Sequence, residues 1–138
     1  MAFPGIKLFD LHGRTALITG GSKGLGKVIA SGLASAGANV VLVSRHGAEA
    51  QEAADEIAAD HGQGALGIEA DITVPAQIDA MIAIARESFG GIDILVNSAG
   101  INTRGPIEAI TLEQFEELMQ INVTGTWLCC KTVIPLMK

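Results

Sequence analysis

Short apolar runs alternate with longer amphipathic segments along the whole chain. Four apolar runs, each bounded by glycine or polar residues, predict strands at residues 15–19, 39–44, 65–71 and 92–96. The run at 39–44, NVVLVS, is almost continuously apolar, as expected for a strand that helices cover on both faces. Between these runs apolar residues recur every three or four positions, which predicts helices. The alternation indicates an α/β domain with a parallel sheet.

Turn and capping residues delimit four predicted helices. Thr111 and Gln114 have the spacing of a capping box at the start of the fourth, which Gly125 and Pro135 are expected to weaken. The helices extend from the glycines after residue 19 to about 36, from 48 to 60, from 75 to 89, and from 111 towards 135. Because crossovers between parallel strands are right-handed, we expect a doubly wound sheet with strand order 3-2-1-4.

Composition narrows the class of protein. The chain has 138 residues, of which 49% are hydrophobic and 17% charged, as in one soluble globular domain. Cys129 and Cys130 are adjacent and no signal peptide precedes them, so we expect a cytoplasmic protein without disulfides or a metal site. No apolar run is long enough to span a membrane. The net charge of −6 argues against nucleic acid as a partner.

A glycine-rich turn lies between the first strand and the first helix. Gly20 is expected to make the tight turn, Gly24 to let the main chain approach a ligand, and Gly26 to let the helix lie close to the sheet. Backbone N–H groups at a helix start, without a Cβ in the way, favour a diphosphate. The alternative is a flexible surface turn, but an apolar strand before it and an amphipathic helix after it favour phosphate binding.

This Thr-Gly-x-x-x-Gly-x-Gly spacing, which begins at Thr19, resembles the short-chain dehydrogenase/reductase family. Three further stretches match that family in order: Asp71-Ile72 after the third strand, Asn97-Ser98-Ala99-Gly100 after the fourth, and Asn122 in the last helix. The match departs from the family at Ser98, where the family carries asparagine. Taken singly, Asp71 could be only an acidic turn residue, Asn97 only a loop cap, and Asn122 only a polar residue in a long helix. Within the family, the opening residues 8–11 and the general character of the sequence resemble sugar-acid or glucose dehydrogenases most.

The resemblance implies a Rossmann-like fold in which residues 1–138 form the dinucleotide-binding half domain, ending before a fifth strand. It also implies that Asp71 contacts adenine and that Asn122 supports a proton relay. Asn122 is the candidate catalytic residue. The candidate cofactor-binding residues are Thr19, Gly20, Ser22, Lys23, Gly24, Leu25, Gly26, Ser44, Arg45, Asp71, Ile72, Asn97, Ala99 and Gly100.

The end of the second strand indicates which cofactor is preferred. Many NAD-binding folds carry an acid about 20 residues beyond the glycines, whereas this chain has Ser44 and Arg45. Ser44 can hydrogen-bond the 2′-phosphate of NADP, and Arg45 and Lys23 can pair with it. We therefore expect NADP, with NAD possible; the alternative is that both cations are ordinary solvated charges. The three histidines, His12, His46 and His61, are expected to be exposed loop residues, with assistance to the phosphate as the alternative for His46.

In the family, a serine and a Tyr-x-x-x-Lys segment complete the catalytic group. The chain contains no tyrosine and ends at Lys138 before either would appear, so we expect negligible dehydrogenase activity from these residues alone. The fourth strand would then be an exposed sheet edge, and the last helix is strongly apolar. We expect a homo-oligomer formed through one of these two elements.

Three function classes remain open at this point. The chain can be part of an NADP-dependent oxidoreductase, which the motifs favour. It can be a freestanding nucleotide-binding module without chemistry, or a structural half that assembles without nucleotide. Residues beyond Lys138 separate the first class from the other two, and a cofactor titration separates the second from the third.

Overall fold

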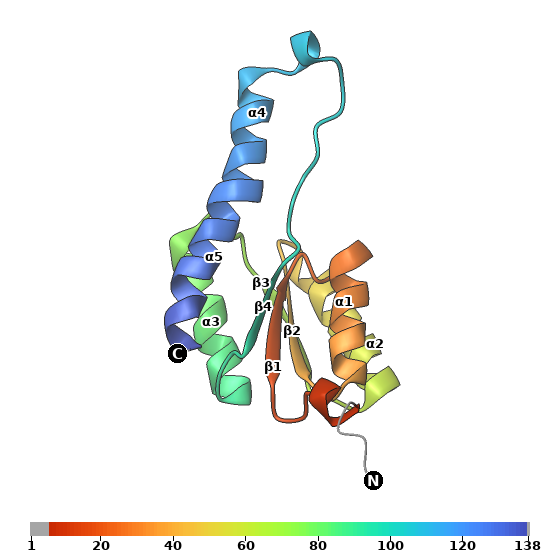
Figure 1. Ribbon diagram of the computed structural model, residues 1–138. Coiled ribbons are helices and arrows are strands. Elements are labelled where there is room, and N and C mark those ends of the chain that lie inside the picture. Colours follow the sequence, from red (N-terminus) through yellow and green to blue (C-terminus); the bar gives the residue numbers. More distant parts are fainter. Residues whose placement is uncertain (1–5, 138) are drawn as a thin grey trace.

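Four parallel strands form one sheet at the centre of the molecule (Figure 1). The computed structural model describes residues 6–137. The strands pair in the order β3-β2-β1-β4, which confirms the predicted topology, and Leu17 lies opposite both Val41 and Leu95. Their bounds are β1 (Thr15–Thr19), β2 (Asn39–Ser44), β3 (Ala65–Glu69) and β4 (Ile94–Asn97).

Helices cover both faces of this sheet, so the doubly wound α/β class is also confirmed. Helices α1 and α2 lie on one face, and α3 and α5 lie on the other (Figure 1). Helix α4 and the segment before it extend beyond the carboxyl ends of the strands. The helices are α1 (Gly24–Ser35), α2 (Gly47–His61), α3 (Pro75–Phe89), α4 (Leu112–Met119) and α5 (Thr126–Val133), with short turns η1 (Ile6–Phe9), η2 (Ile107–Ala109), η3 (Gln120–Gly125) and η4 (Ile134–Leu136).

The core consists of two apolar clusters, one on each face of the sheet. Alternate strand residues point to opposite faces, so Leu17 packs with α3 and α5 while Ile18 packs with α1 and α2. The α1–α2 side is built largely from alanines, which let the helices lie close to the strands. At Gly67 in β3, an added Cβ would overlap the backbone of Gln51 in α2. This burial on both faces explains why the strands are continuous apolar runs.

Three strand ends differ from the prediction. Strand β3 ends at Glu69 rather than residue 71, because the Asp71 carboxylate accepts hydrogen bonds from Thr73 and turns the chain away. Strand β4 begins at Ile94 rather than residue 92 and ends at Asn97 rather than residue 96. The carboxylate of Asp93 just before it accepts from the backbone N–H of Thr15 at 2.9 Å. Side chains that bond to the backbone thus decide where pairing stops.

The predicted last helix is interrupted at its centre. The capping box of Thr111 and Gln114 is confirmed. Between α4 and α5, however, η3 is a π-helical turn that includes Gly125, so the segment is not one uniform α-helix. A Cβ on Gly125 would lie 2.7 Å from Ile72 Cδ1, so this stretch packs closely on the loop after β3. The expectation of weakness at Gly125 is consistent with this turn, and Pro135 lies in the closing η4 turn.

The expectation for His61 was wrong. His61 is the last residue of α2 and half-buried, not an exposed loop residue. Its Nε2 atom lies 2.8 Å from Ser31 Oγ on α1, so it joins the two helices. Periodicity placed the end of the helix one residue too early. Within residues 6–137, no helix has the length and apolar character needed to cross a membrane.

Candidate functional site

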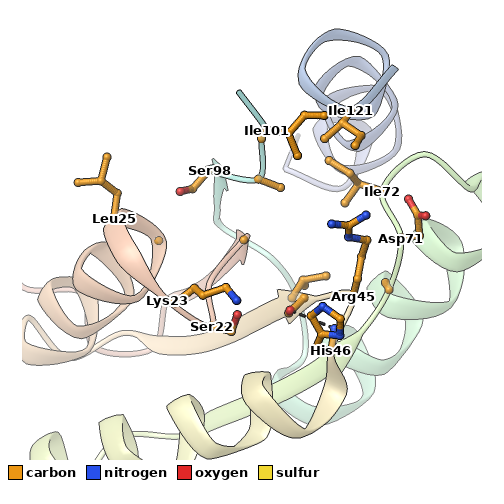
Figure 2. Close-up of a pocket in the computed structure, with 17 residues that line it drawn as sticks. Ser22, Lys23, Leu25, Arg45, His46, Asp71, Ile72, Ser98, Ile101 and Ile121 are labelled. Carbon is orange, nitrogen blue, oxygen red and sulfur yellow. Dashed lines mark hydrogen bonds between the residues drawn. The ribbon is translucent and has the colours of Figure 1, made fainter. Parts of the chain in front are cut away.

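A pocket of about 370 Å³ opens at the carboxyl ends of the strands (Figure 2). Ligands of doubly wound sheets bind at this edge, where the strand order reverses. The turn after β1 and the segments after β2, β3 and β4 all contribute to it. Its lining consists of Gly20, Ser22, Lys23, Leu25, Gly26, Val43, Ser44, Arg45, His46, Ala70, Asp71, Ile72, Ser98, Ala99, Gly100, Ile101 and Ile121.

The glycine turn after β1 forms one wall and is sterically constrained. Gly20 has a φ of 65°, and a Cβ there would lie 2.8 Å from the Cα of Ala99. A Cβ on Gly26 would overlap the carbonyl oxygen of Gly20, so Gly26 lets the turn fold against the start of α1. Gly24 also has positive φ, 58°, but faces open space. These positions require glycine for distinct reasons.

The role expected of Gly26 needs a correction. Its nearest neighbours belong to the turn itself, namely Gly20 and Gly21. Close packing on the neighbouring strand falls to Gly21, where a Cβ would lie 3.0 Å from the Cβ of Leu42 in β2. The spacing pattern could not distinguish these roles because both glycines lie within one short turn.

Thr19 connects the turn to the segment after β4. Its side chain is buried, and its Oγ1 atom accepts a hydrogen bond from the N–H of Ala99 at 3.2 Å. The same hydroxyl lies 3.5 Å from the carbonyl oxygen of Val96, to which it donates. Thr19 is therefore not part of the pocket lining but fixes two segments that are.

Asn97 and Asn122 also lie outside the lining. Asn97 is exposed, and its Nδ2 atom lies 3.4 Å from Cys130 Sγ on α5. Asn122 lies in η3, where its Oδ1 accepts from the N–H of Ile101 and its Nδ2 donates to the Ile101 carbonyl, each at 2.8 Å. Asn122 thus holds Ile101, which lines the pocket, whereas Asn97 contacts α5 outside the lining. The role of both asparagines towards a ligand stays a prediction.

Polar side chains gather at the ends of β2 and β3. Figure 2 shows Lys23 and Ser22 extending from the glycine turn towards His46, while the Arg45 guanidinium lies near Asp71 and Ile72. The hydroxyl of Ser44 accepts a hydrogen bond from the backbone N–H of His46 at 3.1 Å. The pocket therefore combines two cations with a carboxylate.

His46 was expected to be an exposed loop residue, with assistance to a phosphate as the alternative. It is exposed and lies just before α2, and it also belongs to the pocket lining. Its place there is compatible with the alternative, and its role towards a ligand stays a prediction.

The Asp71 carboxyl is held in its ionised form. A hydrogen bond from the Thr73 side chain at 2.7 Å is the main reason that its pKa is lowered, and the backbone N–H of Thr73 at 2.8 Å adds to it. The positive charge of Arg45 acts in the same direction, and partial burial opposes it. An ionised carboxylate in this place can accept hydrogen bonds from a ligand.

Most of the residues predicted for the cofactor line this one pocket; Thr19, Gly24 and Asn97 do not, and neither does the candidate catalytic residue Asn122. Sequence reasoning missed a mainly apolar group in the lining. Ser98 and Ile101 flank predicted positions, and Ile121 precedes Asn122, so adjacency was the available signal. The missed residues are Val43, His46, Ala70, Ser98, Ile101 and Ile121.

The same turn and the same sheet occur in known proteins. The model of the family described as short chain dehydrogenase matches residues 14–138. The chain belongs to this family. The family resemblance expected from the glycine turn is therefore confirmed.

Relatives of this family member are considerably longer than it is. The 3beta-hydroxysteroid dehydrogenase 1 of Eggerthella lenta is 34% identical over 91% of this chain and 48% of its own length. A short-chain type dehydrogenase/reductase from Mycobacterium marinum is 42% identical, with a TM-score of 0.91, over 96% of this chain and 53% of its own. L-Sorbose reductase from Gluconobacter frateurii, solved with NADPH and L-sorbose, is 34% identical, with a TM-score of 0.87, over 94% and 49%. The chain thus spans about half the length of the proteins it matches.

Proposed function

We propose that residues 1–138 form the dinucleotide-binding half of an oxidoreductase that acts on an alcohol or carbonyl substrate and prefers NADP to NAD. One observation carries the proposal: the glycine turn, two cations and an ionised carboxylate all border the same pocket. Membership of the short-chain dehydrogenase family supports it.

The residues present fit such a cofactor. In the turn from Gly20 to Gly26, the close contacts at Gly20 and Gly26 leave no room for a Cβ, and the turn begins a helix, which suits a diphosphate. Asp71 has the charge to accept from the amino group of adenine. The apolar side chains of Ile72, Ile101 and Ile121 face one another above the pocket (Figure 2), which would exclude water from a bound ring. When bound, the nicotinamide donates or accepts a hydride.

The preference for NADP follows from the charges around β2. No acid ends that strand; Ser44 and Arg45 stand there, and Lys23 lines the same pocket. A phosphate on the adenosine ribose would enter a pocket that two cations and a hydroxyl border. The likeness to the L-sorbose reductase solved with NADPH supports this preference.

We propose a sugar or sugar-acid substrate for the whole protein. The likeness to L-sorbose reductase and to D-threitol dehydrogenase of Mycolicibacterium smegmatis, 36% identical over 91% of this chain, supports a polyol or sugar. The 138 residues contain no tyrosine. We therefore propose that they bind the cofactor but do not turn over substrate alone, with Asn122 as a supporting group.

A second copy of the chain is the proposed partner. Strand β4 is at the edge of the sheet, where its outer backbone groups face no further strand among the described residues. Along α4 and α5, exposed apolar side chains form a row: Leu112, Phe115, Met119, Val123 and Trp127. A cytoplasmic location is also proposed, since Cys129 and Cys130 are free thiols.

Calorimetric titration of the 138-residue chain with NADP and with NAD tests the binding proposal. We expect both to bind and NADP to bind more tightly. The variant Arg45→Gln should weaken binding of NADP more than binding of NAD, while Arg86→Gln, on the exposed side of α3, should change neither affinity.

Absence of binding of both nucleotides would refute the proposed function, and equal or tighter NAD binding would refute the preference. Turnover of sugars or secondary alcohols with NADP by these residues alone would refute the proposed inactivity.

A further inference from the structure

Lys23, one of the two cations in the pocket, is already paired with an acid. Its Nζ atom lies 3.2 Å from Oε2 of Glu49, which is in the first turn of α2. The two side chains are 76% and 47% exposed, so both are accessible to a ligand at the mouth of the pocket. Glu49 itself is not among the residues that line the pocket. It therefore influences that site from its rim.

We propose that Glu49 is a specificity-determining residue, which lowers the preference for NADP over NAD by holding and partly neutralising Lys23. This inference rests on the proposed function. The 2′-phosphate of NADP carries close to two negative charges at neutral pH. A cation that is already paired with an acid attracts it less than an unpaired cation would. Glu49 shares the ammonium of Lys23 and also repels the phosphate. NAD lacks this phosphate and is indifferent to the ion pair.

The second cation of the pocket is shared in a similar way. Figure 2 shows the Arg45 guanidinium near Asp71, on the side of the pocket away from Lys23. Each of the two cations therefore has an acidic residue beside it that competes with a phosphate. Since Asp71 has a proposed role with adenine, Glu49 is the acid of the two whose effect is confined to the charged group that distinguishes the two cofactors.

A second ion pair, between α1 and α2, offers a matched control. Lys27 of α1 pairs with Glu56 of α2, which repeats the arrangement further along both helices. Neither residue lines the pocket. Any general effect of removing an acid from α2, on stability or on net charge, will appear equally in a Glu56 variant.

The test is calorimetric titration of the chain with NADP and with NAD. The wild-type chain is compared with three single variants, Glu49→Gln, Glu56→Gln and Lys23→Gln, and with the double variant that combines Lys23→Gln and Glu49→Gln. A surface ion pair contributes little to a binding free energy, because water and salt screen both charges. We therefore expect Glu49→Gln to tighten NADP about two- to fivefold, to leave NAD unchanged, and to lose this gain at high salt. Glu56→Gln should alter neither affinity. In the Lys23→Gln background, the gain from Glu49→Gln should largely disappear.

The outcomes separate this inference from the proposed function. If the wild-type chain binds neither nucleotide, the proposed function fails and this inference fails with it. If nucleotides bind but Glu49→Gln leaves the ratio of the two affinities unchanged, only the inference fails. It fails also if Glu56→Gln gives the same gain, or if the full gain persists without Lys23. Circular dichroism of each variant checks that the fold is retained.

Discussion

The side-chain amide of Asn122 bonds to both backbone groups of Ile101. Its Oδ1 accepts the N–H and its Nδ2 donates to the carbonyl, each at 2.8 Å. Ile101 lines the pocket and Asn122 lies in the π-helical turn η3. This pair therefore connects the segment after β4 to the helix that follows, across 21 residues of chain.

Replacing Asn122 by alanine should destabilise the chain and loosen the pocket wall. Both backbone groups of the half-buried Ile101 lose their partner, which costs about 1–3 kcal/mol. Urea unfolding should show this loss, and NADP should bind more weakly. The exposed Asn102 provides the control, since Asn102→Ala should change neither quantity measurably. An unchanged midpoint for Asn122→Ala would show that water replaces the amide without cost.

The glycines of α1 should respond in opposite directions to the same substitution. Gly26→Ala places a Cβ on the carbonyl oxygen of Gly20, so we expect a loss of about 2 kcal/mol or more and weaker nucleotide binding. Gly32→Ala meets nothing within 4 Å and lies in the same helix, so it should stabilise by about 0.5–1 kcal/mol. Thermal unfolding measures both. Equal effects at the two positions would contradict the steric account of the turn.

The lowered pKa of Asp71 predicts a dependence of stability on pH. A carboxyl with a lower pKa in the folded state contributes stability that is complete above its unfolded pKa, roughly 4. That contribution is lost as the pH falls through the lower, folded pKa. Because the Thr73 hydroxyl is the main cause, Thr73→Val should raise the Asp71 pKa and reduce this acid-sensitive contribution. NMR titration of the carboxyl carbon measures the shift. A pKa of Asp71 unchanged in Thr73→Val would contradict the assignment.

The two adjacent cysteines should differ in reactivity. Burial, and next the neighbouring Cys130, raises the pKa of Cys129 to about 11, so its reactive thiolate is scarce at pH 8. Cys130 is only half-buried. Iodoacetamide should therefore label Cys130 alone in the native chain and both residues in urea, as followed by mass spectrometry. Rapid native labelling of Cys129 would show that α5 opens readily.

Self-association should occur at micromolar concentration. Sedimentation equilibrium is expected to give at least a dimer for the wild-type chain. Charged residues in the exposed row, as in Phe115→Glu with Trp127→Glu, should dissociate it if α4 and α5 form the interface. Persistence of the oligomer in that variant would point to the edge of β4 instead. A monomer for the wild-type chain would contradict the proposal.

Much of the fold could be predicted because its signals are local. The apolar run of β2, the capping box at Thr111 and the glycines after β1 each carry their meaning within a few residues. The handedness of crossovers then leaves one strand order. Predictions failed where a side chain bonded to a backbone group, as at Asp71. The weakness expected at Gly125 is consistent with the structure, but its form as a π-helical turn could not be predicted, because it depends on packing against Ile72.

The sequence by itself determined the sheet, its order and the place of the glycine-rich turn, since periodicity and glycine spacing record them directly. The tertiary structure alone decided what surrounds that turn. Glu49 reaches Lys23 across 26 residues, and Asn122 reaches Ile101 across 21, only because helices pack beside one another and beside the strand ends. Such contacts depend on where whole elements dock, and no local pattern of residues specifies that.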